Sequence, residues 1–432
     1  MATSAQLREQ IAAGRWDGPL AALYGTAPQE LARQRARYCA ALEQFELYFG
    51  PGRQVQVYSA PGRAELGGNH TDHQHGYGLA AAVTLDLVAV AARNTDGYVR
   101  VKSRGFNKLD VIDLATAEPQ EGESTHSASL IRGIAEGFRT AGKAIGGFDA
   151  YTASDVLRGS GLSSSAAFEM GMACIWNGEY ACGLDARALA GICQYAENTY
   201  FGKPSGQLDQ LASAVGGVIF ADFADPAAPQ VEKIHADGLL PPGMTLCVTD
   251  TRGSHSELTG EFAAIRQEME AVAACLGGKV LGQVPETDFW AVLPRLRTAC
   301  GDRAVLRAIH FFDENRRVDS QRRALAENDL EAYFEGVRAS GLSSFRYLQN
   351  VYTNKNVAEQ GLSLALCLTE HFFDREGVRG VCRVHGGGFA GTIQAYVPAD
   401  RAADYAAAMN AVFGADSCYV LRIRRSGAVK VF

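Results

Sequence analysis

The chain has 432 residues, a length that favours two or three domains if one domain takes about 150 residues. Hydrophobic residues make up 47% and charged residues 21% of it, which excludes a disordered or low-complexity chain. The 41 Lys and Arg against 48 Asp and Glu give a net charge of −7, whereas a general nucleic-acid binder needs a basic surface. Glycine is abundant, at 47 residues against 13 prolines, without a Gly-X-Y repeat, so these glycines serve sharp turns or the close approach of backbone to a ligand.

Predicted strands gather in the first half of the chain, and predicted helices dominate after about residue 250. In chain order, apolar patterning predicts strands at 54–58, 80–91, 98–102, 110–114, 149–157, 217–223, 244–249, 380–384 and 393–397. Helical spacing predicts helices at 28–48, 128–140, 164–177, 186–200, 258–276, 329–339, 362–373 and 402–413. This mixture favours an α+β fold with two domains, 1–215 and 216–432, divided within the weakly patterned region 213–240.

Cysteine usage and apolar run lengths bear on the compartment. The ten cysteines form no Cys-x-x-Cys pair, and most lie in apolar runs, as Cys247 does, which predicts reduced, buried thiols rather than disulfides or a zinc site. Residues 1–16 lack the apolar segment of a signal peptide, and the longest apolar run, 79–92, is interrupted by Asp86 and too short to span a bilayer. We therefore expect a soluble, cytoplasmic protein that does not bind membranes.

The first glycine cluster, residues 61–76, is predicted to be a short polar loop directly after a strand. It contains four glycines, Arg63, Asp72 and three histidines, namely His70, His73 and His75. The histidines and Asp72 could ligate a metal, and a glycine-rich turn with exposed polar side chains is a second interpretation. A site for a sugar or another small polar ligand explains the composition better, because carboxylate, imidazole and amide groups hold hydroxyls and glycine lets the backbone come close.

The second glycine cluster, residues 158–170, follows an extended run and opens a helix rich in Ala and Met. Glycines before serines at a helix start offer backbone N–H groups, hydroxyls and the positive end of the helix dipole, which favour an anion, most often a phosphate. The cluster has no Gly-Lys-Ser/Thr and is not a Walker A motif, and the lack of Gly-x-Gly-x-x-Gly disfavours a dinucleotide fold. A capped helix whose small residues pack against a neighbour is the alternative.

Two further segments are candidates for phosphate chemistry. The third glycine cluster, residues 385–391, lies between two predicted strands and fits either a wide turn or a cover over phosphates. In the segment 196–210, a predicted helix ends near Glu197 and a Gly/Pro/Ser loop presents Asp209. Such carboxylates are often only solvated, but beside a phosphate loop a kinase needs one on Mg²⁺ and another near the accepting hydroxyl.

In this order the motifs resemble those of the galactokinase family, in the GHMP kinase superfamily of small-molecule kinases. The family pattern Gly-Arg-Val-Asn-Leu-Ile-Gly-Glu-His-Thr-Asp-Tyr is similar to residues 62–73, with departures, and the phosphate loop Gly-x-Gly-Leu-Ser-Ser-Ser-Ala-Ala is matched completely by 159–167. Residues 196–210 are similar to the segment that ends in Asp-Gln, with Ser205 in place of Cys. Residues 310–318 look like the Glu-Asn-Arg-Arg-Val helix and 386–391 like the third glycine-rich motif.

The resemblance implies a two-domain, GHMP-kinase-like α+β fold with the active site in the cleft between the domains. It implies that ATP phosphorylates the anomeric hydroxyl of galactose or a close relative, in a monomer or weak homo-oligomer that needs no nucleic acid. Asp209 would be the catalytic aspartate and Arg63 the arginine that stabilises developing charge, while Ser165 and Glu197 would hold Mg²⁺. Contacts to ATP would come from Gly159, Ser160, Gly161, Leu162, Ser163, Ser164, Ser165, Gly386, Gly387 and Gly388, and contacts to the sugar from Asn69, His70, Thr71, Asp72 and Phe262.

Two departures from the family pattern bear on the sugar. Asn69 stands where the family has the glutamate that holds the sugar C6 hydroxyl, and Phe262 where it has a sugar-contacting tyrosine. Both changes remove a polar contact or a negative charge, and a neutral Asn no longer repels a carboxylate. A kinase for a modified galactose, such as galacturonate or N-acetylgalactosamine, is therefore the alternative. A catalytically silent sugar sensor is a third possibility, disfavoured because the catalytic set is present, namely Arg63, Ser165, Glu197 and Asp209.

Overall fold

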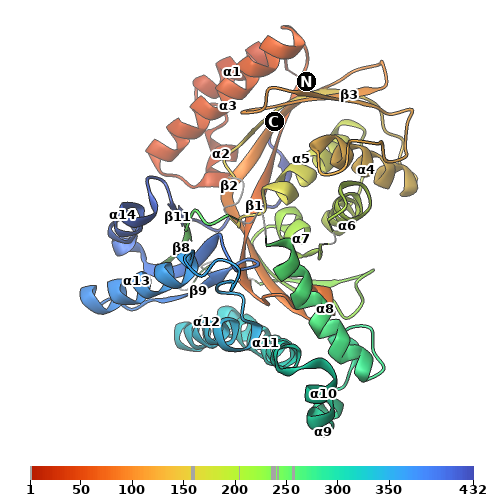
Figure 1. Cartoon of the computed structure of the whole chain (residues 1–432). Coiled ribbons are helices and arrows are strands. Elements are labelled where there is room, and N and C mark those ends of the chain that lie inside the picture. Colours follow the sequence, from red (N-terminus) through yellow and green to blue (C-terminus); the bar gives the residue numbers. More distant parts are fainter. Residues whose placement is uncertain (1, 157–160, 204, 235–239, 241–242, 255–257) are drawn as a thin grey trace.

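Two β-sheets organise the chain (Figure 1). The computed structural model describes residues 2–156, 161–203, 205–234, 240, 243–254 and 258–432. The larger sheet consists of β1 (Gln56–Gly67), β2 (Tyr77–Arg93), β3 (Tyr98–Ser103), β4 (Leu109–Asp113), β5 (Phe148–Ser154), β6 (Val218–Asp222), β7 (Gln230–Ile234) and β12 (Val429–Lys430). These strands lie in the order β12-β1-β2-β5-β3-β4, with β6 paired to β2 and β7 to β6, and of these pairs only β3 with β5 is parallel.

The smaller sheet is antiparallel throughout its described pairs. It consists of β8 (Met244–Asp250), β9 (Val381–His385), β10 (Thr392–Pro398) and β11 (Cys418–Leu421), in the order β11-β8-β10-β9. The helices α13 (Gly361–Glu376) and α14 (Ala402–Phe413) pack their apolar faces against these strands. Together the two sheets and their helices confirm the predicted α+β class.

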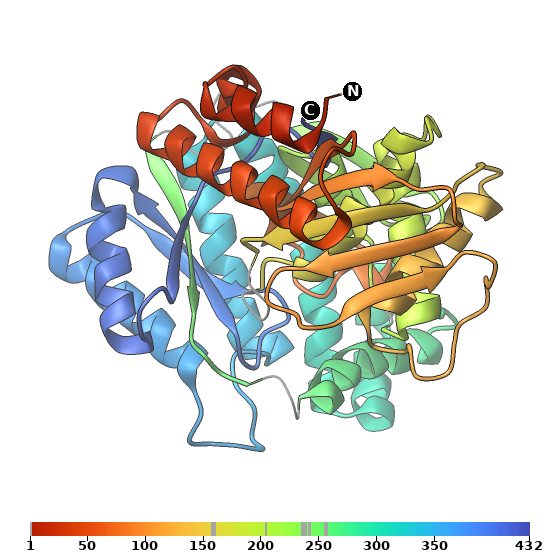
Figure 2. The ribbon, with the colours of Figure 1, turned by 90° about the horizontal axis from the view of Figure 1, so that it is seen from above.

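Helices cover both faces of the larger sheet (Figure 2). One face carries α1 (Ser4–Ala12), α2 (Asp17–Tyr24) and α3 (Pro28–Phe49), and the other carries α4 (Ser127–Thr140), α5 (Ser164–Glu179), α6 (Ala186–Ala196) and α7 (Leu208–Val215). Side chains alternate between the faces, so Val57 and Val88 pack with the N-terminal helices while Tyr58 and Ala89 pack with α4–α7. Burial on both faces explains why β2 is a long, largely apolar run.

The remaining helices form a second helical layer after β8. They are α8 (Thr259–Cys275), α9 (Glu286–Ala291), α10 (Leu293–Cys300), α11 (Asp302–Glu327) and α12 (Leu330–Ser343). Single-turn elements are η1 (Asp72–Gln74), η2 (Glu197–Phe201), η3 (Leu281–Gln283), η4 (Ser344–Leu348) and η5 (Ala399–Arg401), of which η2 and η4 are π-helical. Among the described residues, no helix is long and apolar enough to cross a membrane.

The structure corrects the first glycine cluster. Residues 61–67 were expected in a loop, but they continue β1, and the loop covers only the residues that follow. Two register shifts against β2, at Pro61/Arg63 and Glu65/Gly67, let the strand bend there. Gly62 lets the backbone at Leu162 come close to β1, because a Cβ on Gly62 would lie 2.7 Å from the carbonyl oxygen of Leu162.

Other differences concern elements with weak patterning. The helix predicted at 186–200 ends at Ala196 and is followed by the π-helical η2. The sequence indicated a helix only at 310–318, whereas α11 extends over Asp302–Glu327. The helices α1, α2, α7, α9 and α10 and the strands β7, β11 and β12 were not predicted. Asp209, which was expected on a loop, lies in the first turn of α7. The strands β6 and β7, which follow residue 215, belong to the larger sheet together with the strands before it. The division into two domains at residue 215 stays a prediction.

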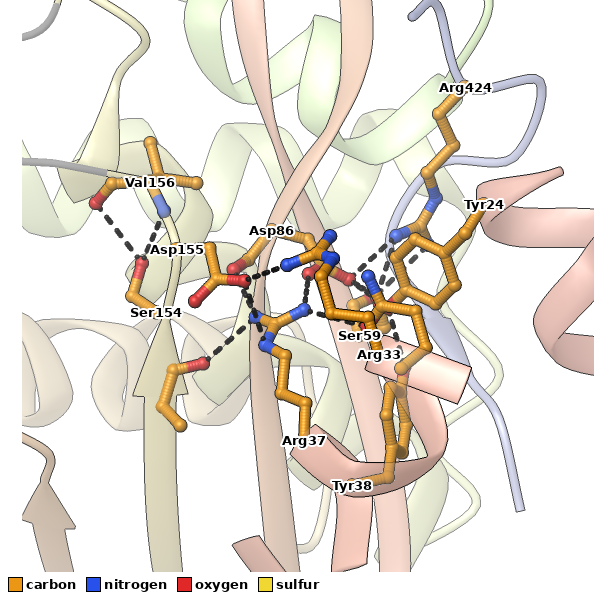
Figure 3. Close-up of polar contacts among 12 residues, drawn as sticks. Tyr24, Arg33, Arg37, Tyr38, Ser59, Asp86, Ser154, Asp155, Val156 and Arg424 are labelled. Atoms are coloured by element: carbon orange, nitrogen blue, oxygen red, sulfur yellow. Dashed lines mark hydrogen bonds and ion pairs between the residues drawn. The ribbon is translucent and has the colours of Figure 1, made fainter. Parts of the chain in front are cut away.

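A buried ionic cluster joins three distant segments on the N-terminal face of the larger sheet (Figure 3). Asp86 of β2 is fully buried and accepts from Arg37 Nη1 of α3 at 2.6 Å and from Arg424 Nη1 near the C-terminus at 3.1 Å. The hydroxyls of Tyr24 and Ser59 also donate to this carboxylate. Burial would raise the pKa of Asp86, but the two guanidinium groups outweigh it, so the pKa is lowered and the carboxylate is ionised.

The same cluster reaches the entrance of the second glycine cluster. Asp155, directly after β5, accepts from Arg33 Nη1 at 3.3 Å and from Arg104 Nη2 at 2.9 Å, and Arg37 Nε lies 3.1 Å from it. The Asp155 backbone N–H donates to the carbonyl of Asp86 at 2.9 Å. The N-terminal helices therefore hold the chain where it leaves the sheet.

Candidate active site

Arg63 of β1 and Asp209 in the first turn of α7 form a bidentate ion pair. Arg63 Nε lies 2.6 Å from Oδ1 and Nη2 lies 2.9 Å from Oδ2 of Asp209. Burial would raise the pKa of Asp209, but the charge and hydrogen bonds of Arg63 and a hydrogen bond from Ser163 lower it. Asp209 is therefore ionised at neutral pH, and its two oxygens hold the Arg63 guanidinium in a fixed position.

Gly161 and Ser163 of the second glycine cluster, the predicted phosphate loop, contact this ion pair. Arg63 Nη1 donates to the carbonyl of Gly161, and the hydroxyl of Ser163 donates to Asp209. Gly161 has φ +69°, and a Cβ there would lie 2.4 Å from Thr392 Oγ1 of β10, so this loop also touches the smaller sheet. Ser163 has φ +55°, a left-handed conformation that costs energy in a non-glycine residue.

The other predicted residues of this loop are only partly described. Gly159 and Ser160 lie outside the described residues. Leu162 is buried, and Ser164 and Ser165 form the start of α5. An anion at this helix start would meet free backbone N–H groups, as the glycine–serine pattern predicts.

Glu197 lies at the start of η2 with a buried carboxylate that has four donors. Ser165 Oγ lies 3.3 Å and Lys203 Nζ 2.7 Å from Oε1, while Gln210 Nε2 at 3.0 Å and the hydroxyl of Ser205 donate to Oε2. The Ser165 hydroxyl and the Glu197 carboxylate are hard oxygen ligands of the kind Mg²⁺ prefers, with nucleotide phosphates and water completing its shell. The two oxygen ligands, from Ser165 and Glu197, therefore fit Mg²⁺.

The histidines of the first cluster do not form a metal centre with Asp72. Over the described part of the chain, no group of three or more His, Cys, Asp or Glu side chains is placed to hold a metal ion. The rings of His70 and His73 lie 5.7 Å apart, edge to face. Burial lowers the pKa of His73 to about 3, so this imidazole is neutral.

Asn69 lies at the centre of a buried amide network. Its Nδ2 donates to Glu65 Oε1 at 3.0 Å and to the carbonyl of Gly386 at 2.6 Å, and its Oδ1 accepts from Asn350 Nδ2 at 2.7 Å. The side chain is fully buried. Both N–H groups of this amide are used within the protein, so Asn69 links the first glycine cluster to the third.

Backbone carbonyls of the third glycine cluster contact side chains of the first cluster. His70 Nε2 lies 2.9 Å from the carbonyl oxygen of Gly387, so this nitrogen carries the proton. The His70 ring also stacks on Phe262 of α8, with ring centroids 6.5 Å apart. Gly388 has φ +82°, and a Cβ there would lie 2.1 Å from the carbonyl oxygen of Asn350. The contact of Gly386, Gly387 and Gly388 with ATP stays a prediction.

Thr71 and Asp72 occupy different environments in the loop. Thr71 is fully buried, and its hydroxyl donates to the backbone carbonyls of Gly68 and Tyr77. Asp72 packs against the loop that leads to Asp209, because a Cβ on Gly206 would lie 1.7 Å from Asp72 Oδ2. Burial raises the pKa of Asp72 to about 6, and the charge of Asp209 adds to the rise.

The raised pKa of Asp72 predicts a pH-dependent cost in stability. A carboxyl with a folded pKa of about 6 and an unfolded pKa near 3.8 binds its proton more tightly in the folded state, so ionising it costs stability increasingly as pH rises from about 4 to 6, and the cost is constant above that range. We expect Asp72→Asn to stabilise the chain more at pH 8 than at pH 4.5, with a difference of about 2 kcal/mol. Urea unfolding of both proteins at both pH values measures it, and an equal effect at the two values would contradict the buried carboxyl.

Glu169 and Gln210 lie beside Glu197, although the sequence analysis gave neither of them a role. Gln210 Nε2 lies 3.0 Å from Glu169 Oε2 and 3.0 Å from Glu197 Oε2, so one amide bridges two buried carboxyl groups. Burial and then the charge of Glu197 raise the pKa of Glu169 well above its usual range. The sequence spacing could have indicated Glu169, because it follows Ser165 by four residues and lies on the same face of the helix.

Comparisons with known proteins agree with the geometry. A family model described as "Galactokinase galactose-binding signature" matches residues 43–93, and "GHMP kinases N terminal domain" matches 129–217. A galactokinase of Streptomyces coelicolor is 36% identical over 309 residues, covering 70% of this chain and 77% of the relative. A galactokinase of Mycobacterium tuberculosis is 32% identical over 354 residues, covering 81% and 91%.

Solved structures show the same fold. The structure of Lactococcus lactis galactokinase complexed with galactose matches with a TM-score of 0.76 at 25% identity and covers 90% of this chain and 98% of that one. Methanococcus jannaschii mevalonate kinase matches with a TM-score of 0.60 at 14% identity, covering 86% and 99%. The predicted GHMP-kinase-like fold is confirmed.

Proposed function

The chain belongs to the galactokinase family, and from this premise we propose that its Arg63–Asp209 pair carries phosphoryl transfer from ATP to the anomeric hydroxyl of galactose. The chain is an ATP-dependent phosphotransferase that acts on a sugar hydroxyl. The observation that carries the assignment of roles is the bidentate ion pair itself, which stands where β1, α7 and the phosphate loop meet. It puts one anion for the hydroxyl and one cation for the phosphoryl group side by side.

Asp209 orients the attacking hydroxyl and receives its proton. Because Arg63 and Ser163 keep the pKa of Asp209 low, the carboxylate is ionised and ready to accept a hydrogen bond, but it is a weak base towards an intact hydroxyl. Proton transfer therefore follows bond formation to phosphorus, which acidifies the hydroxyl. In a loose transition state such late transfer suffices, since positioning and charge stabilisation supply most of the rate.

Arg63 stabilises charge on the transferred group. Its guanidinium is fixed by Asp209 on one side and by the carbonyl of Gly161 on the other, so it needs no reorganisation during the reaction. Ser165 and Glu197 are the side chains that would hold Mg²⁺, which supplies further neutralisation of the phosphate oxygens when bound. The phosphate loop adds backbone N–H groups at the start of α5.

The galactose-binding signature at 43–93 and the pairing of Arg383 favour galactose over a uronate as the acceptor. Asn69 is neutral, and the nearby Glu65 carboxylate accepts hydrogen bonds from Asn69 Nδ2 and from Arg383 Nη2, each at 3.0 Å. Arg383 is fully buried and is also 2.9 Å from Ser340 Oγ, so this cation is already paired. Because Arg383 is held by Glu65, it is not available to pair with a substrate carboxylate, which a uronate would have to bury without this cation.

The position of the new phosphate tests the proposal. With galactose and ATP, we expect ADP release together with a sugar phosphate that has lost its reducing end, because the phosphate blocks the anomeric carbon. A product that still reduces copper reagents would place the phosphate on another hydroxyl. Binding of galactose without any ADP release would instead favour the silent sensor.

Three further assignments accompany this function as proposals. We propose that the protein acts in the cytoplasm, as a monomer or weak homo-oligomer. We propose that residues 1–215 and 216–432 form the two domains, with the active site in the cleft between them. The proposed site supports this cleft, because Arg63 comes from the larger sheet while Gly386 follows a strand of the smaller one.

A further inference from the structure

The carboxylate of Glu197 already has a cationic partner within the chain. Lys203 Nζ lies 2.7 Å from Glu197 Oε1, and the Glu197 side chain is 3% exposed against 55% for Lys203. The turn that brings them together is local. Gly202 ends η2 with φ +83°, and the Lys203 backbone N–H donates to the Glu197 carbonyl at 3.1 Å, which folds the lysine back over the carboxylate.

The lysine and a divalent ion compete for one oxygen. Ser165 Oγ lies 3.3 Å from Glu197 Oε1, the same atom that Lys203 contacts, so an ion held by Ser165 and Glu197 would bind at Oε1. The other oxygen, Oε2, already accepts from Ser205 and Gln210. Mg²⁺ binds carboxylate oxygen at about 2.0–2.1 Å, and an ammonium within about 4 Å of it would be strongly repelled.

Lys203 is the only exposed residue among the four donors on Glu197, and Ser205 contacts the other oxygen, Oε2. Gln210 is buried and bridges Glu169, and Ser165 is fixed at the start of α5. The half-exposed lysine can rotate into solvent at little cost, whereas the buried Glu197 needs a positive charge near it whenever no metal is present.

We propose that Lys203 is a built-in substitute for the divalent cation, which neutralises Glu197 in the metal-free protein and is displaced when the ion binds with ATP. This inference rests on the proposed role of Ser165 and Glu197 as metal ligands. Lys203 is then a positioning residue: it keeps the carboxylate ordered between catalytic cycles, at the expense of weaker metal binding.

Manganese binding tests the proposal without relying on turnover. The free Mn²⁺ signal in electron paramagnetic resonance gives the affinity in the presence of a non-hydrolysable ATP analogue. We expect Lys203→Met to bind Mn²⁺ about three- to tenfold more tightly than the wild type, the scale of one partly exposed charge. Lys203→Arg, which keeps the charge, and Lys279→Met, an exposed lysine elsewhere, should stay close to the wild type.

A second readout follows thermal unfolding in EDTA. Lys203→Met should unfold at a lower temperature than the wild type, because Glu197 loses its only cationic partner among the described contacts, and saturating Mn²⁺ with the ATP analogue should close this gap. If Lys203→Met does not fold, Lys203→Gln takes its place in both measurements. Unchanged or weaker Mn²⁺ binding would overturn the proposal. Absence of galactose phosphorylation by the wild type, with the manganese effect intact, would overturn the proposed function instead.

Discussion

Replacing Asp209 by Asn is expected to lower kcat by about 10²- to 10⁴-fold, the usual contribution of a positioned base. The amide keeps the size of the side chain but cannot take the proton of the sugar hydroxyl. It also loses the bidentate ion pair that fixes Arg63, at 2.6 and 2.9 Å. Affinity for ATP should change little, because the predicted phosphate loop offers its own backbone N–H donors at the start of α5.

Steady-state kinetics with galactose and calorimetric titration of an ATP analogue separate the two effects. Asp374→Asn is a suitable control, since Asp374 is an exposed carboxylate on α13. A loss of kcat in the Asp209 variant with intact nucleotide binding supports its role at the reacting hydroxyl. Turnover near the wild-type value would remove Asp209 from the mechanism.

Replacing Asp86 by Ala is expected to destabilise the fold by about 3–5 kcal/mol, the range for breaking a buried ion pair from one side. The substitution leaves two buried guanidinium groups, Arg37 and Arg424, without their carboxylate. The hydroxyls of Tyr24 and Ser59 also lose an acceptor (Figure 3). Since these residues come from α2, α3, β1, β2 and the C-terminal segment, the loss should loosen the whole N-terminal face of the sheet.

Urea denaturation at pH 7 measures this effect, with Asp374→Ala as the exposed control. The lowered pKa of Asp86 adds a pH signature. A carboxylate whose folded pKa is depressed stabilises the fold above its unfolded pKa, and this contribution disappears as pH falls through the folded pKa. The difference between the wild type and Asp86→Ala should therefore shrink in strongly acidic solution. A loss below about 1 kcal/mol at pH 7, typical of an exposed pair, would contradict the buried network.

Long apolar runs and short motifs made much of this molecule predictable. The run at 80–91 predicted the centre of β2 because a strand covered on both faces is apolar along its whole length. The glycine–serine pattern located the start of α5, since a helix start offers free N–H donors to an anion and small residues let that anion come close. The order of the motifs then identified the family, which the comparisons confirm.

Contacts between distant segments could not be predicted from the sequence. Arg424 reaches Asp86 across 338 residues, and no local pattern indicates which arginine pairs with an isolated aspartate in a strand. Glu65 likewise was not singled out, although it supplies the carboxylate next to Asn69. The loop prediction for residues 61–67 was wrong because glycine and proline suggested a turn, whereas two register shifts accommodate them within β1.

The central claim is that the chain phosphorylates galactose through Arg63 and Asp209. The most direct measurement is ADP release with ATP across galactose, galacturonate, N-acetylgalactosamine and glucose, for the wild type and for Asp209→Asn. We predict that galactose is turned over most efficiently, that galacturonate is rejected because Arg383, held by Glu65, cannot pair with its carboxylate, and that the variant loses the galactose activity. Efficient turnover of galacturonate with galactose inert, or full activity of the variant, would contradict the account.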